Sequence, residues 1–201
     1  MPIDYPQLGA FLAALVALVA SPGPATLGLA AAGAAFGFSS ARPFLIGSIC
    51  GAALVITLVG SGVVSVLMAQ PEVSSVLIGI AAAYMLFLAY RIATAPPIGE
   101  TATKGRTPGF GGGFLLGITN PKGYAVFATL FSGFVVVPND VTGDAIFKGL
   151  VLFILLTVID VSWLIAGNAL RHLFHDPKIS RHINSAFAVL LLASVVLAVA
   201  L

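Results

Sequence analysis

The segment Gly117-Ile118-Thr119-Asn120-Pro121-Lys122-Gly123 places a lysine beside a proline, inside an apolar stretch that runs from about Phe110 to Val137. A lysine in the middle of a membrane span is costly unless it is paired or hydrated, so such residues commonly mark a substrate or ion path. The adjacent proline removes a backbone donor and interrupts the helix at the same depth. A charge and a helix break at one depth of a span predict a transporter.

The composition of the chain identifies the solvent in which it folds. Of its 201 residues, 59% are hydrophobic and 8% are charged, whereas soluble domains carry about 25% charged residues. We therefore predict an all-α integral membrane protein in a lipid bilayer. The net charge of +2 is too small and too scattered for nucleic-acid binding.

Six apolar segments reach the length of about 20 residues that a membrane-spanning helix needs. They form one predicted transmembrane transporter domain over residues 1–201. The first segment is interpreted as a retained helix and not as a signal peptide, because no lysine or arginine precedes it. The predicted spans run approximately from Leu8 to Ala32, Pro43 to Ala69, Val73 to Ala93, Phe110 to Val137, Ala145 to Ala169 and Ile183 to Leu201.

The basic residues in the loops and near the ends of the spans predict the orientation of the chain. Seven of them fall on one side of the predicted membrane, and basic residues favour the cytoplasmic side. The opposite side carries Lys148 with four acidic residues. Both termini are therefore predicted on the outer, periplasmic side, with the loops after the first, third and fifth spans in the cytoplasm. The seven are Arg42, Arg91, Lys104, Arg106, Arg171, Lys178 and Arg181, and the four acids are Asp4, Glu72, Asp140 and Asp144.

The two halves of the chain share a local pattern. Ser21-Pro22-Gly23-Pro24 in the first span matches Asn120-Pro121-Lys122-Gly123 in the fourth, and Pro22 and Pro121 are 99 residues apart. A polar linker over about 95–109 separates repeat one, about 1–94, from repeat two, about 110–201. With three spans in each half, the second half enters the membrane from the other side. We predict two inverted three-helix repeats, an arrangement in which broken helices meet at a midplane site.

The two interrupted motifs contain the candidate binding residues. The first comprises Pro22, Gly23 and Pro24, which delete two backbone donors around a flexible glycine; the alternative is a harmless kink. In the second motif, Asn120 offers both a donor and an acceptor, which suits a zwitterionic solute. Pro121 interrupts the helix, and Lys122 supplies a positive charge for a carboxylate or a site for a proton. The alternative role of the lysine is a fixed cation that bonds loose carbonyls or a structural acid.

Asp160 is the acidic residue near the middle of the fifth span, and by residue count it lies close to the depth of Lys122. A buried lysine–aspartate pair would satisfy both charges and would provide a group that can exchange a proton. A proton-coupling role for Asp160 and a purely structural salt bridge both remain open.

Other features carry less weight. His172 and His175 have an i, i+3 spacing but no further ligand set, so no metal site is predicted, and no cofactor is expected. Three glycine series have small-xxx-small spacing, which favours close packing within one chain over a dimer interface, while a homodimer remains an alternative. These series are Gly33/Gly37, Gly47/Gly51 and Gly109/Gly113/Gly117.

Over essentially its whole length, the chain resembles the LysE/RhtB family of bacterial amino-acid exporters. The resemblance implies a small inner-membrane exporter of amino acids or similar metabolites, driven by the proton gradient, with Pro22, Gly23, Pro24, Asn120, Pro121 and Lys122 around the transport path. Ala25 departs from the Asn or Asp that members often have there, and Gly123 from the usual Ala. The residues that carry the resemblance are Pro22-Gly23-Pro24, Gly79 to Met85, Asn120-Pro121-Lys122, Asp160 and Trp163.

The leading hypothesis is a secondary transporter that exports small solutes by proton antiport and alternating access. An exporter of inorganic cations or another solute on the same scaffold is an alternative, but Asp160 is the single carboxylate predicted in mid-span. An intramembrane enzyme would need a second acid or a base near a nucleophile, so no enzyme is predicted. A non-transporting assembly subunit would not need a lysine and two helix breaks at one depth.

Overall fold

The structure, a computed structural model, describes residues 3–64, 71–94, 109–170 and 177–200. Within these ranges the regular elements are helices, as predicted for an all-α protein, and none of the described residues lies in a strand. Residues 95–108 of the predicted linker, together with His172 and His175, lie outside the described residues. The helices are α1 (Tyr5–Ala20), α2 (Pro24–Phe36), α3 (Phe38–Gly60), α5 (Pro71–Ala93), α6 (Phe110–Thr119), α7 (Pro121–Gly133), α8 (Val141–Ala169) and α9 (Pro177–Ala200).

The first predicted span is two helices, α1 and α2, bent by 52° at the Pro-Gly-Pro motif. The chain leaves α1 at Ser21 in an extended conformation and enters α2 at Pro24, the first helical residue. Proline is well tolerated at that position because its missing N–H would have no helical partner there. The predicted break in the first span is confirmed.

The fourth predicted span is divided in the same way. Helix α6 ends at Thr119, Asn120 is extended, and Pro121 begins α7. Proline is therefore the first residue of the helix that follows each break. The sequence correctly predicted both interruptions, because a proline side chain prevents the preceding turn from continuing.

The remaining spans differ from the prediction in their limits. Helix α3 begins at Phe38, before the predicted start at Pro43, and contains that proline. The carbonyl of Ser39, which Pro43 leaves without its helical donor, accepts a hydrogen bond from Arg42 Nε at 3.3 Å. By length and apolarity, α3 and α8 are each able to cross a membrane among the described residues, and the bent pair α1–α2 is a third candidate when it is counted as one span.

Glycines allow two pairs of helices to approach through their backbones. A Cβ on Gly113 of α6 would lie 1.8 Å from the Phe44 carbonyl oxygen of α3. A Cβ on Gly167 of α8 would lie 1.9 Å from the Ala30 carbonyl oxygen of α2. The α3–α6 and α2–α8 pairs also have the most extensive helix contacts of the described residues. We call these two interfaces the glycine seams. They confirm that the glycine spacing in these helices serves packing within one chain.

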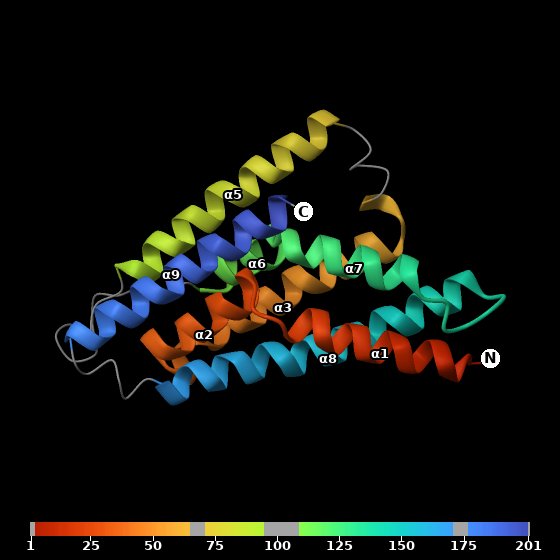
Figure 1. Ribbon diagram of the computed structural model, residues 1–201, viewed down its shortest axis with the longest axis horizontal. Coiled ribbons are helices and arrows are strands. Elements are labelled where there is room, and N and C mark those ends of the chain that lie inside the picture. Colours follow the sequence, from red (N-terminus) through yellow and green to blue (C-terminus); the bar gives the residue numbers. More distant parts are fainter. Residues whose placement is uncertain (1–2, 65–70, 95–108, 171–176, 201) are drawn as a thin grey trace.

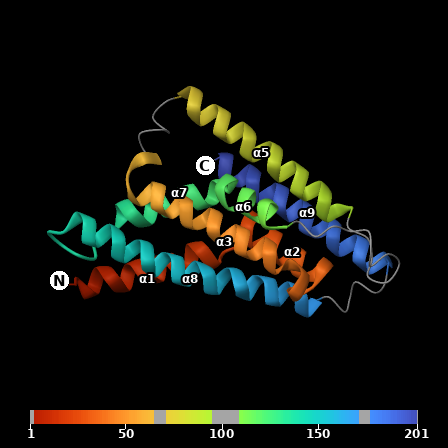
Figure 2. The same ribbon diagram turned by 180° about the vertical axis from the view of Figure 1, so that it is seen from behind.

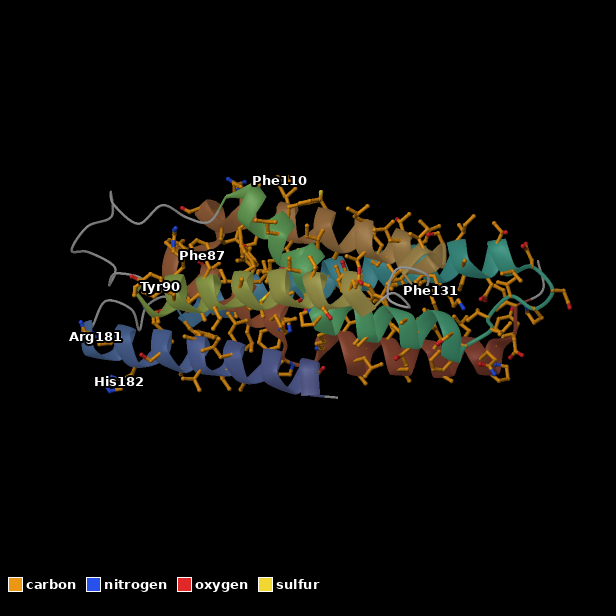
Figure 3. The ribbon with its side chains drawn as sticks, turned by 90° about the horizontal axis from the view of Figure 1, so that it is seen from above. Phe87, Tyr90, Phe110, Phe131, Arg181 and His182 are labelled. Carbon is orange, nitrogen blue, oxygen red and sulfur yellow. The ribbon has the colours of Figure 1, made fainter. Side chains whose placement is uncertain are left out.

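The helices form an elongated bundle in which α5 and α9 lie side by side along one edge (Figure 1 and Figure 2). Tyr90, Phe110, Arg181 and His182 gather at one end of the bundle, and Phe131 lies toward the other (Figure 3). One apolar cluster packs α1, α7 and the second half of α3. A second packs α2, α5 and the first half of α3. The two helix breaks lie between these clusters.

Candidate functional site

A small cavity of about 40 Å³ lies where the two helix breaks meet. This volume admits a few water molecules, since one water needs roughly 10–15 Å³. The wall contains both apolar and polar side chains. The apolar and small residues are Val19, Gly23, Ala25, Ala52, Gly117, Gly123, Val126, Phe127 and Leu156, and the polar ones are Thr26, Ser48, Asn120, Lys122 and Asp160.

Four predicted site residues line this cavity: Gly23, Asn120, Lys122 and Asp160. Pro22, Pro24 and Pro121 are not among the lining residues; they shape the breaks that open onto the cavity. The sequence motifs of the two halves are therefore brought together in space.

Lys122 reaches from the second helix break into the first. Its Nζ donates a hydrogen bond to Ser21 Oγ at 2.8 Å and another to the Ser21 carbonyl oxygen. That carbonyl belongs to the extended residue at the end of α1, where the helix offers it no donor. An ammonium group has three N–H donors, so two are used on Ser21 and one is left for another partner.

Gly23 makes room for the lysine side chain. A Cβ at this position would lie 2.6 Å from Lys122 Cδ, closer than real contacts allow. The Gly23 N–H donates to Thr26 Oγ1 at 2.9 Å, and the Thr26 hydroxyl donates to the Gly23 carbonyl oxygen at 3.1 Å. Thr26 therefore fixes the backbone of the break, while Gly23 leaves a path for the Lys122 side chain.

Asp160 is 3% exposed and lines the same cavity as Lys122. The direct ion pair considered from the sequence is not formed, because no Asp160 oxygen lies within 4.0 Å of Lys122 Nζ. The lysine bonds instead to Ser21, whose carbonyl the first break leaves without a helical donor. The alternative role predicted for Lys122, a cation that bonds loose carbonyls, is therefore confirmed, although residue count could not identify Ser21 as the partner.

Sequence reasoning missed Ser48, which lies on α3 within the apolar wall. Ser48 is 1% exposed, and its Oγ has no hydrogen-bond partner. The Oδ1 atom of Asn120 is also buried without a partner. Buried polar atoms are nearly always hydrogen-bonded, so two exceptions in one cavity indicate a site for a polar ligand. A serine between Gly47 and Gly51 was the available signal, but many membrane serines simply bond their own helix.

Two helix N-termini open onto the cavity. Helix α2 begins at Pro24, and its next two residues, Ala25 and Thr26, line the cavity wall. Helix α7 begins at Pro121, followed by Lys122 and Gly123 in the wall. The first N–H groups of a helix lack internal partners and carry a partial positive charge, which favours an anion.

A second buried charge cluster, also missed from the sequence, joins α8 to the end of α7. Lys148 Nζ lies 2.5 Å from Asp144 Oδ2, and both residues are buried. The lysine also donates to the Phe131 and Phe134 carbonyl oxygens. Asp144 Oδ1 accepts from the Val136 and Val137 N–H groups at 2.7 and 2.8 Å. Every polar contact here serves the chain between α7 and α8, so this cluster is structural.

Asp144→Asn is expected to destabilise the protein by about 3–5 kcal/mol, because it leaves Lys148 buried without its counter-charge. Thermal unfolding in detergent measures the effect. Asp140→Asn is the matched control, since Asp140 is exposed and its Oδ1 caps α8 through the Gly143 N–H; asparagine caps helices equally well. Equal loss of stability in both variants would contradict the structural role of the pair.

Apolar helices that enclose a polar cavity at two breaks define the chain as an integral membrane protein. The model of the LysE type translocators matches residues 16–201, and the chain belongs to this family.

Curated relatives align over nearly the whole chain. The cysteine/O-acetylserine efflux proteins of Salmonella choleraesuis (strain SC-B67) and Salmonella typhimurium are each 29% identical over 184 residues, which is 92% of this chain and 93% of the relative. The protein of that name from Escherichia coli O139:H28 is 26% identical over 185 residues. No solved structure matches the chain.

Proposed function

We propose that this translocator exports small amino acids or related metabolites from the cytoplasm, by proton antiport with alternating access. The observation that carries the proposal is the cavity between the two helix breaks, which holds one cationic and one acidic side chain. The names of the relatives, which describe efflux of cysteine and O-acetylserine, support the substrate class.

The cavity offers separate surroundings for the two charges of an amino acid. The free N–H of Lys122 and the N-termini of α2 and α7 favour a carboxylate. Asp160 favours an ammonium group on the α8 side. The wall contains small residues such as Ala25 and Ala52 and the bulky ring of Phe127. Together they favour a substrate with a short side chain.

The proposed architecture is six spans in two inverted three-helix repeats, with both termini on the outer side of the bacterial inner membrane. Gly23 and Lys122 support it, because they occupy matching positions 99 residues apart and a Cβ on the first would strike the second. Contact between matching positions is the signature of an approximate two-fold axis. In this scheme the site lies on that axis and opens alternately to each side.

Proton coupling is assigned to Asp160 in this proposal. Among the residues that line the cavity, Lys122 and Asp160 carry titratable groups. The ammonium of Lys122 is engaged by Ser21, whereas Asp160 has no ion pair within 4.0 Å. A proton on Asp160 would replace the bound substrate amine on the return step, which links export to proton entry.

The test is exchange of labelled amino acids across proteoliposomes that contain the purified protein. We expect counterflow of serine and cysteine, accelerated by an imposed pH gradient. Asp160→Asn should retain some exchange but lose the acceleration by the gradient, while Asp140→Asn should behave as the unmodified protein. Flux of inorganic cations without amino-acid exchange would reject the proposal, and so would an undiminished gradient response in Asp160→Asn.

A further inference from the structure

We propose that Ser48, Asn120 and Asp160 form a three-oxygen site for a primary ammonium group, so that solutes with a blocked amine are not carried. This inference rests on the proposed transport function and assigns the part of the cavity that selects the substrate. Ser48 was not among the residues that the sequence singled out.

The three residues come from different elements but line one cavity. Ser48 lies on α3, Asn120 lies between α6 and α7, and Asp160 lies on α8. Ser48 Oγ and Asn120 Oδ1 are buried and accept no hydrogen bond. A buried acceptor without a donor is unfavourable. A ligand that donates hydrogen bonds to both atoms would therefore gain binding free energy.

A primary ammonium group fits this wall chemically. It carries three N–H donors and no acceptor, which matches three oxygens, and its charge is balanced by the Asp160 carboxylate. A calcium ion would require six to eight oxygen ligands, which this wall does not supply.

The bonds between Lys122 and Ser21 keep Asp160 free for this purpose. Because Lys122 Nζ is held by the Ser21 hydroxyl and carbonyl, the ammonium of the protein does not occupy the carboxylate. The substrate amine can then pair with the Asp160 carboxylate, which an ion pair with Lys122 would have blocked.

The α3–α6 glycine seam fixes the position of Ser48. A Cβ on Gly117 would lie 2.5 Å from the Ser48 carbonyl oxygen, so the two backbones touch at this point. Asn120 follows Gly117 by one helical turn. The seam therefore holds Ser48 and Asn120 at the same wall of the cavity.

Two isomers provide a direct test. O-acetylserine has a free ammonium group and N-acetylserine does not, although the two compounds have the same molecular formula. In proteoliposomes at mildly acidic pH, where the acetyl group stays on oxygen, we expect counterflow of serine and O-acetylserine but none of N-acetylserine. Thermal stabilisation of the detergent-solubilised protein by serine, but not by N-acetylserine, is the expected binding result.

Ser48→Ala removes one of the three oxygens. We expect the KM for serine to rise about 10-fold or more, the effect of one hydrogen bond from a charged donor. Ser61→Ala makes the same change at the exposed residue that follows the end of α3, where the hydroxyl bonds the Leu58 carbonyl, and the KM of this variant should not change.

The outcomes separate the two proposals. Equal exchange of N-acetylserine and O-acetylserine would overturn the ammonium site but leave amino-acid export standing, and an unchanged KM in folded Ser48→Ala would overturn it as well. If none of the three solutes is exchanged, the transport function fails. In that case stabilisation by serine and O-acetylserine, but not by N-acetylserine, would still support the site, and no stabilisation by any of the three would reject it.

Discussion

Lys122→Met is expected to lower the rate of serine counterflow by about 100-fold, because a hydrogen bond to a charged group contributes about 1.5–3 kcal/mol, or roughly 10- to 150-fold. Methionine keeps most of the length of the side chain but cannot bond to Ser21 or attract a carboxylate. The measurement is the initial rate of exchange in proteoliposomes, at equal amounts of folded protein.

Ser21→Ala is the graded comparison for this change. It removes the hydroxyl that accepts from Lys122 Nζ, while the Ser21 carbonyl remains as a partner. We expect a loss of about 10-fold or less, since one hydrogen bond is removed and the charge stays. Serine exchange by Lys122→Met at the unmodified rate would show that the transport path does not pass this lysine.

Gly113→Ala is expected to lower the free energy of unfolding by about 3 kcal/mol or more, at the upper end of the effects of overpacking. The added Cβ would lie 1.8 Å from the Phe44 carbonyl oxygen. Since the obstacle is backbone, it cannot rotate away as a side chain would. Helices α3 and α6 would have to separate along their whole contact.

Gly111→Ala is the matched control, on the same helix. A Cβ on Gly111 meets no atom within 4 Å. Alanine should leave stability unchanged or raise it by about 0.5–1 kcal/mol through its higher helix propensity. Thermal unfolding of both variants in detergent measures the difference. Gly113→Ala with the stability of Gly111→Ala would contradict the close approach of the two backbones.

The sequence predicted the features that depend on the covalent chemistry of single residues. Pro22, Pro24 and Pro121 each remove a backbone donor from the helix, and both breaks occur where they stand. The glycine spacing predicted close packing, and a Cβ on Gly33 or Gly113 would lie 2.3 or 1.8 Å from a neighbouring backbone oxygen. Asn120, Lys122 and Asp160 were selected as polar residues at similar depth, and they line one cavity.

Features that depend on the partner of a side chain could not be predicted. Serines in apolar helices usually bond their own backbone, as Ser61, Ser132 and Ser162 do. Ser48 differs in having no partner for its Oγ, and only the packing of its neighbours reveals that difference.

Lys122 and Lys148 show the same limit. The sequence allowed Lys122 either Asp160 or loose backbone carbonyls as partners, and the structure gives it the Ser21 carbonyl and hydroxyl from the other half of the chain. The sequence placed Lys148 only among the charged residues on the outer side of the membrane. In the structure it is buried and forms a salt bridge with Asp144. In both cases the competing backbone carbonyls become visible only when the ends of distant helices are placed in space.

The glycine seams have a mechanical consequence. Backbones in contact cannot slide past each other, since no rotamer change relieves a clash between main-chain atoms. The α2–α8 and α3–α6 regions are therefore stiff. On the other side of the breaks, the contacts of α1 and α7 include Phe11, Leu15 and Phe127, and such side chains repack. Compliance is thus concentrated in one half of the bundle, and the helix breaks lie at its boundary with the stiff half.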